Sequence, residues 1–311
     1  MLLSIIIPVL NEADGFSILH DKLEEVFTKL PCDYEVIFIN DGSTDNTSEK
    51  IQEWINTNNH IVLLELSRNF GHQSAITAGL HESKGDAVIV MDADLQDPPN
   101  LIPELLAQWN KGYKVVIAQR RSRGENFIRK MLFNAFYKIF DLLSDFPIKI
   151  ASGVFGLMDR TVVDHLTLMK EQNRFIPGMR AWLGFKTAVV TYDRQPRAFG
   201  EPKQSLRKLI KYGFDALFSF SYKPLRLSFF LGLIVSSLCF SYAFVLLVLR
   251  LLNVNVVSGF TTVAIAIFFI GGVLLISNGI LGEYLGRIYD EVKKRPYFII
   301  ERKISHPKNQ K

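Results

Sequence analysis

The residues with the clearest chemical meaning form an acidic cluster, Asp92-Ala93-Asp94-Leu95-Gln96-Asp97, which two prolines follow. An apolar run at residues 87–91 precedes it, which indicates a buried strand that carries acids to the carboxyl edge of a sheet, where open α/β sheets bind ligands. Two carboxylates one residue apart are costly to bury unless a cation lies between them. Mg²⁺ takes one or two carboxylates together with phosphate oxygens, so the cluster predicts a divalent metal that holds a diphosphate. A polar turn after a strand is the alternative interpretation.

The elements that must position these acids alternate along the first two-thirds of the chain. Apolar runs predict strands at residues 3–9, 35–39, 61–66, 87–91 and 114–118. Intervening stretches predict helices at residues 16–30, 47–58, 73–83 and 101–111. This alternation is typical of an α/β domain with a mostly parallel sheet covered on both faces.

Polar side chains follow each of the five predicted strands. They are Asn11 with Glu12, the run 40–45, the run 67–73, the acidic cluster, and the basic run 119–123. Each run by itself is typical of a turn, but five at one edge of a sheet favour a nucleotide pocket. The glycine-rich signatures of dinucleotide-binding and P-loop proteins do not occur in the sequence, so those two classes lack support.

Composition limits the other classes. The chain has 311 residues and a formal net charge of +5, which is long enough for one large domain and an appendage. Its two cysteines, Cys32 and Cys239, lie far apart, so we expect neither a disulfide framework nor a zinc motif. Residues 1–10 lack a basic region and a small-residue cleavage site, which favours a first strand over a signal peptide.

Two uncharged apolar stretches lie in the last third of the chain, at residues 227–249 and 251–282. Each is long enough to cross about 30 Å of hydrocarbon at about 1.5 Å per residue. Basic residues flank the pair on its outer sides, and the connection at 253–259 has no Lys or Arg. The positive-inside rule therefore predicts two transmembrane helices with both termini in the cytoplasm, although Arg250 runs against it. A buried helical hairpin is the alternative.

Residues 205–221 have an amphipathic pattern. Leu206, Leu209 and Ile210 begin an apolar face at helical spacing, and Arg207 and Lys208 begin a basic face. Such a helix can lie in the headgroup plane, where each basic residue gains about 1 kcal/mol from anionic lipid. Because a spanning segment follows, we favour the membrane interface over an ordinary helix on the soluble domain.

These features together resemble the inverting glycosyltransferases of family 2, which have the GT-A fold. The likeness is strongest to the polyprenyl-phosphate glycosyltransferases, which include bacterial undecaprenyl-phosphate glucosyltransferases and dolichyl-phosphate mannose synthase, and it covers nearly the whole chain. The motifs that carry it are Ile7-Pro8-Val9-Leu10-Asn11-Glu12, Asn40-Asp41-Gly42-Ser43-Thr44-Asp45, Ser67-Arg68-Asn69-Phe70-Gly71, the acidic cluster with Pro98-Pro99, Asn173-Arg174-Phe175, Phe218-Ser219-Phe220-Ser221 and Leu281-Gly282-Glu283-Tyr284-Leu285-Gly286-Arg287.

The resemblance implies a role for each motif residue. It implies that Asp41 hydrogen-bonds uracil, that Asp92 faces the ribose and metal region, and that Asp94 and Gln96 ligate Mg²⁺ or Mn²⁺. The remaining residues that it places in the nucleotide pocket are Pro8, Asn11, Glu12, Ser67 and Ala93. A metal clamp suits this chemistry, because the leaving nucleoside diphosphate develops charge.

The resemblance also implies a UDP-sugar donor and undecaprenyl phosphate, or a similar lipid, as acceptor. A phosphate acceptor is already ionised at neutral pH, so cationic side chains matter more than a strong base. Arg120, Arg121, Arg123 and Arg129 are the candidates, since guanidinium groups pair with phosphate in bidentate fashion, and solvated surface arginines are the alternative. With Asp92 and Asp94, we take Arg120, Arg121 and Arg129 as the candidate catalytic residues. The apolar stretch 127–143 is interpreted as a helix that dips toward the lipid, with a buried helix as the alternative.

Three positions depart from the pattern of this family. Close bacterial relatives usually carry Gly-Asp-Phe-Arg-Leu where this chain has Gly153-Val154-Phe155-Gly156-Leu157, so Val154 replaces the acid thought to assist the acceptor and Gly156 replaces the arginine. Asp159 and Arg160 are the nearest substitutes in the sequence. Asn40 replaces an Asp that is common in the family, which is a milder change.

These inferences define four segments. We expect a cytoplasmic GT-A domain at 1–200, an amphipathic juxtamembrane segment at 201–226, a two-helix transmembrane hairpin at 227–282 and a cytoplasmic tail at 283–311. The expected location is the inner (plasma) membrane, with a homo-oligomer, a tetramer by resemblance, and no nucleic-acid partner. The residues Gly282 and Gly286 offer a small-residue face for such assembly.

The predicted function is transfer of one sugar, glucose or N-acetylglucosamine, to the lipid phosphate for cell-envelope glycosylation. A non-catalytic nucleotide-sugar binder is the main alternative because of Val154 and Gly156, although such a binder has little need for Asp94. A processive polysaccharide synthase would carry Gln-x-x-Arg-Trp, which Arg180-Ala181-Trp182 does not match. A flippase would need ionisable groups within its membrane helices, and these two stretches have none.

Overall fold

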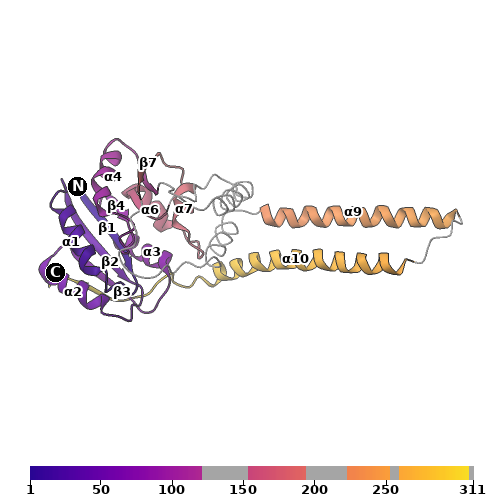
Figure 1. Ribbon diagram of the computed structural model, residues 1–311, viewed down its shortest axis with the longest axis horizontal. Coiled ribbons are helices and arrows are strands. Elements are labelled where there is room, and N and C mark those ends of the chain that lie inside the picture. The colour runs from indigo at the N-terminus through magenta and orange to yellow at the C-terminus, as the bar shows by residue number, and fades with distance from the viewer. Residues whose placement is uncertain (121–152, 194–222, 253–258, 308–311) are drawn as a thin grey trace.

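The computed structural model describes residues 1–120, 153–193, 223–252 and 259–307. Within these ranges, an α/β domain carries two long helices that project from one side (Figure 1). The predictions for Arg121, Arg123, Arg129, the stretch 127–143 and the amphipathic segment 205–221 concern residues outside the described ranges.

One sheet runs through the α/β domain in the strand order β7-β5-β6-β4-β1-β2-β3-β8. Its first five strands along the chain are β1 (Leu2–Val9), β2 (Asp33–Asn40), β3 (Ile61–Leu66), β4 (Ala87–Val90) and β5 (Val115–Arg120). The last three are β6 (Gly156–Asp159), β7 (Thr187–Tyr192) and β8 (Ile300–Ser305). Among the described pairs, β6 and β8 run antiparallel to their neighbours and all the others are parallel, which confirms the predicted α/β fold with a mostly parallel sheet.

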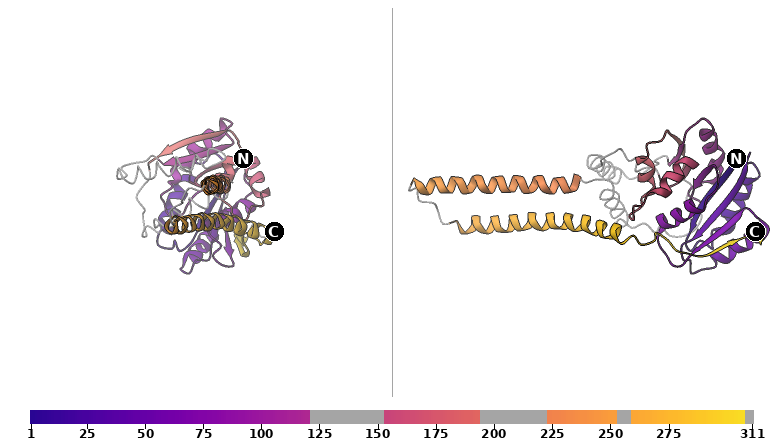
Figure 2. Two further views of the ribbon diagram at one scale, coloured as in Figure 1. Left: turned by 90° about the vertical axis from the view of Figure 1, so that its right-hand side faces the viewer. Right: turned by 180° about the vertical axis from the view of Figure 1, so that it is seen from behind.

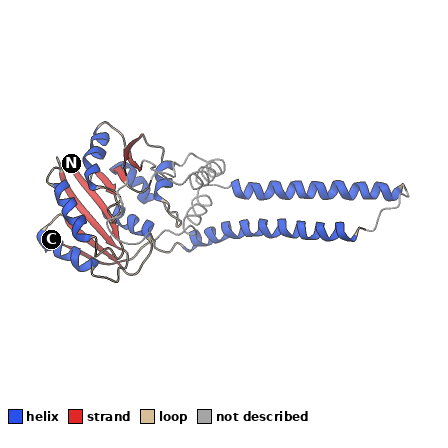
Figure 3. Cartoon of the chain, viewed as in Figure 1, coloured by secondary structure: helices blue, strands red, loops and turns tan. Residues whose placement is uncertain are grey.

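Helices cover both faces of this sheet (Figure 3). One face is packed by α1 (Phe16–Phe27), α2 (Thr47–Thr57) and α4 (Ile102–Asn110), which follows the short 3-10 turn η1 (Pro99–Leu101). The other face is packed by α3 (His72–Glu82), α6 (Arg160–Leu168) and α7 (Ile176–Trp182). Alternate residues of β1 reach opposite cores, since Ile5 packs with the first set and Ile6 with the second. This two-sided burial explains why the predicted strands are almost continuously apolar.

The C-terminal segment returns to the sheet, although the sequence analysis expected a tail there. Strand β8 pairs antiparallel with β3 at the sheet edge, and Arg302 forms an ion pair of 2.6 Å with Glu65. The backbone N–H of Ser67 donates to Ile299 O at 3.0 Å. Because β8 is an edge strand with charged, exposed positions, it lacks the apolar run that identified the central strands.

The two long helices are α9 (Lys223–Leu251) and α10 (Phe260–Lys293), and they lie side by side in both views of Figure 2. Within α10, the stretch Ile265–Lys293 is long and apolar enough to cross a membrane by length and composition. The apolar stretch of α9 found in the described residues, Ser228–Tyr242, is shorter. One of the two predicted spans is therefore supported, and the second stays a prediction.

Candidate active site

The site lies where the strand order reverses beside β1. Strand β1 pairs with β2 on one side and with β4 on the other, and all three are parallel, so their carboxyl ends meet at one edge. Ligands of open α/β sheets bind in the crevice at such a switch point. The loops that leave β1, β2 and β4 at this edge carry Asn11, Asp41 and Asp92 respectively.

The loops after β1 and β2 are joined by side-chain hydrogen bonds. The Asn11 side chain accepts from the backbone N–H of Thr44 at 2.8 Å, and the Asn11 N–H donates to Ser43 Oγ at 3.0 Å. The N–H of Glu12 donates to Thr47 Oγ1 at 3.0 Å. Asn11 has a φ of 54°, a left-handed conformation that costs free energy in a non-glycine residue and is held by these bonds. Asn11 and Glu12 are thus fixed at the predicted edge.

The departure at Asn40 has a structural explanation. Its side-chain oxygen accepts a hydrogen bond from the backbone N–H of Ser43 at 2.8 Å. An Asp carboxylate at this position would accept the same bond, because both residues form this type of turn. The amide therefore preserves the loop that carries Asp41.

Asp41 orders a third loop at the same edge. Its two carboxylate oxygens accept the backbone N–H groups of Phe70 at 2.7 Å and Gly71 at 2.9 Å. Burial raises the pKa of Asp41, and these two hydrogen bonds counter that effect in part. The loop from Ser67 to Gly71 is thereby held beside the nucleotide edge. A contact of Asp41 with uracil stays a prediction.

The acidic cluster itself is electrostatically strained. Burial, followed by the charges of Asp97 and Asp94, raises the pKa of Asp92 to about 7, and Arg120 opposes that rise. Leu95, within the cluster, has a φ of 61°, which marks a backbone conformation rare for a branched residue. The backbone N–H of Gln96 donates to Asp94 Oδ1 at 3.1 Å. The loop thus brings the carboxylates of Asp92, Asp94 and Asp97 close enough to affect one another.

His72 is a site residue that the sequence analysis missed. It is the first residue of α3, and its Nε2 lies 3.1 Å from Asp92 Oδ1 without an aligned hydrogen bond in the described part of the chain. Burial lowers the pKa of His72, so the ring is neutral at pH 7. The sequence did offer one indication of this role, because His72 belongs to the polar run 67–73, which was already predicted to lie at the carboxyl edge.

A divalent cation fits this chemistry. Burial, and then the charges of Asp97 and Asp94, raise the pKa of Asp92, and a cation among these carboxylates would favour their ionised forms. The described residues contain no group of three or more His, Cys, Asp or Glu side chains arranged to hold a metal. Mg²⁺ and Mn²⁺ prefer oxygen ligands, and Mg²⁺ usually completes its shell with water and substrate phosphates. Asp94 and Gln96 therefore fit as protein ligands of a metal that arrives with a diphosphate.

Arg120 lies beside the acidic cluster, at the end of β5. Its Nη2 donates to Asp97 Oδ1 at 3.1 Å and its Nε donates to the Tyr192 hydroxyl at 3.0 Å. Burial by itself would lower the pKa of Arg120, but the charge of Asp97 and the bond to Tyr192 outweigh it and raise the pKa. Arg120 is therefore a permanent cation at the edge, and Asp97 and Tyr192 are site residues that the sequence analysis had not assigned.

The other predicted nucleotide-pocket residues are placed along the same edge. Pro8 lies near the end of β1 and is half-buried, Ser67 follows β3 and is exposed, and Ala93 is buried between Asp92 and Asp94. The structure thus brings Asn11, Asp41 and Asp92 to one edge. Nothing in the geometry of the described residues assigns a ligand contact to Pro8, Ser67 or Ala93, so their roles stay predictions.

The departures at Val154 and Gly156 lie next to this site. Gly156 pairs with Val90 at the end of β4, so Val154 and Phe155 lie beside the acidic cluster. Val154 is partly buried against the second core. A Cβ on Gly156 would lie 2.4 Å from Val116 O, so β6 approaches β5 too closely for a side chain. No carboxylate occupies position 154 or 156.

Asp159 and Arg160 do not replace the missing groups. Asp159 pairs with Ala87 at the start of β4, so it lies at the opposite edge of the sheet. Lys114 Nζ and Trp109 Nε1 donate to its carboxylate, each at 2.9 Å. Arg160 donates to Gly85 O at 2.8 Å at that same edge. The suggestion that they substitute near the acceptor is therefore wrong, because one strand length separates them from the cluster.

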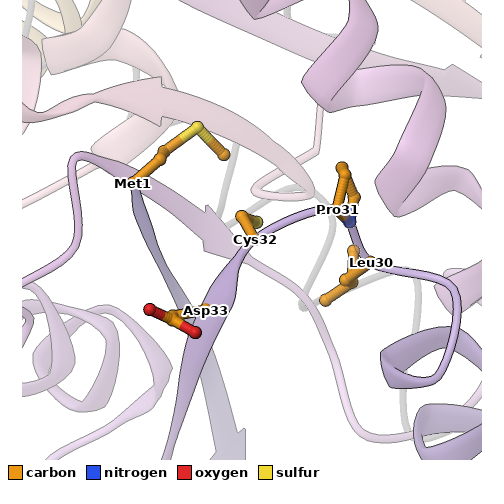
Figure 4. A pocket seen from close by; sticks show the side chains of 5 residues that line it. All are labelled: Met1, Leu30, Pro31, Cys32 and Asp33. Atoms are coloured by element: carbon orange, nitrogen blue, oxygen red, sulfur yellow. The ribbon is translucent and has the colours of Figure 1, made fainter.

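A surface pocket elsewhere in the domain has a different character. It is lined by Met1, Leu30, Pro31, Cys32 and Asp33 (Figure 4). Met1 precedes β1 and Asp33 begins β2, so this hollow lies at the amino edge, away from the acidic cluster. Surface shape by itself would suggest this pocket as the ligand site. Its lining, however, contains only one acidic side chain and no group suited to bind a diphosphate.

Comparison with known proteins agrees with the geometry of the site. The family model described as "Glycosyl transferase family 2" matches residues 4–167. An uncharacterized glycosyltransferase of Synechocystis sp. is 43% identical over 96% of this chain and 94% of its own length. A bactoprenol glucosyl transferase of Shigella phage SfII is 38% identical, over 97% and 98% respectively.

Solved structures share less with the chain. Mannosyl-3-phosphoglycerate synthase from Rubrobacter xylanophilus is 20% identical, with a TM-score of 0.46 over 70% of this chain and 72% of that one. The family model and the full-length relatives carry the assignment instead, since the matched residues include the loops after β1, β2 and β4. The chain therefore belongs to glycosyl transferase family 2 and is a glycosyltransferase.

Proposed function

We propose that this enzyme transfers one sugar from a UDP-sugar to a polyprenyl phosphate such as undecaprenyl phosphate, with inversion at the anomeric carbon. The observation that carries the proposal is the acidic cluster at the switch point, with the fixed cation Arg120 beside it. This juxtaposition suits a diphosphate leaving group and a second anionic reactant. Full-length similarity to bactoprenol glucosyl transferases favours a polyprenyl acceptor and glucose, with N-acetylglucosamine as the second candidate sugar.

The proposed reaction needs no strong base. An ionised oxygen of the acceptor phosphate attacks the anomeric carbon, the bond from that carbon to the UDP oxygen breaks, and UDP leaves with the electron pair. This chemistry accounts for an active enzyme with Val154 beside the cluster, because an ionised phosphate has no proton to remove. Asp94 and Gln96 would hold Mg²⁺ or Mn²⁺, which would offset the charge on the leaving diphosphate.

The protein groups act on charge and orientation. Asp41 fixes the loop from Ser67 to Gly71 through two backbone N–H groups, which preorganises the nucleotide side of the pocket. Arg120 supplies a guanidinium that stays charged beside the acidic loop. Two anionic reactants repel each other, so a fixed cation is needed to hold them within reach of one another.

The long helices fit a lipid acceptor. Large apolar side chains are exposed along both α9 and α10, among them Phe229, Leu238 and Ile267. Such surface is unfavourable in water, and lipid would cover it. We propose that both helices span the membrane and that the α/β domain lies on the cytoplasmic side, where UDP-sugars would reach it.

A non-catalytic nucleotide-sugar binder is the second candidate function. It is favoured by one observation, that positions 154 and 156 carry no ionisable side chain. The acidic cluster weighs against it, because a protein that only binds has less need for closely spaced, buried carboxylates.

Formation of a lipid-linked sugar tests the proposal directly. Purified full-length protein in detergent, with undecaprenyl phosphate and Mn²⁺, is given labelled sugar nucleotides one at a time, and label is followed into the organic phase. We expect transfer from one UDP-sugar, and expect Asp94→Asn to abolish it while the thermal unfolding temperature changes little. Asp164→Asn is the matched control, since Asp164 is an exposed acid on α6. Metal-dependent UDP binding without transfer from any donor would instead support the binder.

A further inference from the structure

Three side chains from distant parts of the chain form a closed hydrogen-bonded unit beside the acidic cluster. The Tyr192 hydroxyl donates to Asp97 Oδ1 at 2.5 Å, and Arg120 Nη2 donates to the same oxygen at 3.1 Å. Arg120 Nε donates to the Tyr192 hydroxyl at 3.0 Å, which closes the ring. Each member therefore restrains the other two.

The backbone places this unit at the site edge. Arg120 and Tyr192 are register partners at the ends of the parallel strands β5 and β7. Asp97 belongs to the loop that follows β4, and its charge is felt by Asp92. The ring of Tyr192 also packs edge-on against Phe155, with centroids 5.9 Å apart, in the segment that leads into β6. Four segments of the site thus meet at one phenol.

The charges within the unit are fixed. Asp97 is only 1% exposed, and a buried carboxylate needs hydrogen-bonding partners, which Arg120 and Tyr192 provide. Burial, followed by the charge of Asp97, raises the pKa of Tyr192, so the phenol keeps its proton at neutral pH. It can therefore donate to Asp97 and accept from Arg120 at once.

Among the described residues, no partner occupies the outer side of the Arg120 guanidinium. Arg120 uses Nε and Nη2 within the unit, and no other partner of Arg120 occurs in the described part of the chain. Its side chain is 36% exposed, so the fork formed by Nη1 and the outer N–H of Nη2 can be reached from outside. Forks of this type bind phosphate oxygens in bidentate fashion.

We infer that Asp97 and Tyr192 are positioning residues that hold Arg120 so that its outer fork receives a phosphate of a reactant. The inference rests on the proposed function and adds two residues to it. The phosphate belongs either to the UDP-sugar or to the lipid acceptor, and both present the same anionic oxygens. A flexible arginine would lose rotamer entropy on binding, and the unit removes that cost in advance.

The same sheet contains a second cluster of similar composition that serves as a control. Lys114 and Trp109 donate to Asp159 at the opposite edge, so that cluster pairs an acid, a base and an aromatic donor far from the proposed chemistry. A purely structural role for the Tyr192 hydroxyl predicts that disruption of either cluster has the same effect. A positioning role predicts an effect on catalysis from one cluster alone.

Tyr192→Phe is the discriminating variant, because it removes one oxygen atom and keeps the ring that packs on Phe155. Initial rates of full-length protein in detergent are measured with donor and acceptor varied separately, alongside binding of UDP with Mn²⁺. We expect kcat/KM to fall by about tenfold or more, as for loss of hydrogen bonds to a charged group. We also expect Arg120→Lys to cost less in the Tyr192→Phe background than by itself. Trp109→Phe should stay within about twofold of the wild type.

The arms of the experiment separate the two sources of phosphate. A raised KM for the lipid with unchanged UDP affinity assigns the fork to the acceptor, and weakened UDP binding assigns it to the donor. Tyr192→Phe with wild-type kcat/KM for both reactants would overturn the inference, as would an equal loss in Trp109→Phe. Absence of transfer by the wild-type enzyme would instead refute the proposed function, so the two failures are distinguishable.

Discussion

Arg180 on α7 provides a sharp test of how buried charge acts in this fold. It is 3% exposed, its Nη2 donates to Gly153 O at 3.3 Å, and its Nη1 has no hydrogen-bond partner within the described ranges. Burial lowers the pKa of Arg180 to about 10. A guanidinium whose charge is disfavoured and incompletely paired should destabilise the fold, so we predict that Arg180→Met stabilises the substrate-free protein.

The magnitude follows from the pKa. A tenfold change in proton affinity corresponds to about 1.4 kcal/mol, so lowering the pKa of Arg180 from its ordinary value to about 10 makes the charged side chain about 3 kcal/mol less favourable in the fold than in the unfolded chain. The penalty applies at neutral pH, where the group is charged in both states, and it would be relieved only as the pH rises beyond about 10. The variant also loses the long hydrogen bond to Gly153 O, which costs about 1 kcal/mol of stability. The expected net increase in the free energy of unfolding is therefore about 2 kcal/mol.

Thermal unfolding of the full-length protein in detergent measures the effect. A gain of about 2 kcal/mol should raise the Tm by roughly 4–8 °C for a domain of this size. Arg174→Met is the matched variant, because Arg174 is also buried but donates to Met169 O at 2.8 Å and Leu166 O at 2.6 Å. That variant leaves two carbonyls without their donors, and it should lower the Tm.

The two arginines should therefore shift the Tm in opposite directions. An equal decrease in both variants would refute the reasoning, because it would mean that Arg180 is stabilised by its surroundings as well as Arg174 is. An unchanged Tm in Arg180→Met would show that relaxation around the guanidinium already removes the penalty.

Two further predictions concern the sheet edge and the acidic cluster. Arg302→Met should lower the stability of the α/β domain by about 1 kcal/mol, because the nearly buried Glu65 loses the ion pair that joins β8 to β3. An unchanged Tm would contradict a stabilising role of this pair. Burial and the neighbouring acids raise the pKa of Asp92 to about 7, so its contribution to the stability of the metal-free protein is present below about pH 4 and is lost as the pH rises through about 7. Mn²⁺ should offset that loss, so it should raise the Tm more at about pH 8 than at about pH 5.5. Asp92→Asn should abolish this difference between the two pH values. An increase in Tm with Mn²⁺ that does not depend on pH would refute the prediction.

Much of the site was accessible to sequence analysis because its signals are local. The apolar run before Asp92 and the polar residues after each strand identify the carboxyl edge without any knowledge of distant contacts. The predicted strands and helices in the first 120 residues match β1 to β5 and α1 to α4 to within a few residues at each end. Continuous apolar strands and amphipathic helices report burial directly, which is why these elements were found.

Other site residues could not be assigned from the sequence, because their roles depend on pairs that are far apart in the chain. Asp97 and Tyr192 are separated by 95 residues and meet only because β7 lies beside β5 at the sheet edge. The approach of His72 to Asp92 depends on how α3 enters the second core. No local pattern distinguishes such a tyrosine or histidine from one that simply fills a core.

The sequence by itself determined the fold class, the family and the acidic edge, since alternating burial and clustered carboxylates are properties of short segments. Tertiary structure alone decided three other features. It returned the C-terminal segment to the sheet as β8, placed Asp159 at the edge opposite to the cluster, and joined Arg120 to Asp97 and Tyr192. Each of these depends on strand order and direction, which long-range packing selects and which no stretch of sequence encodes alone.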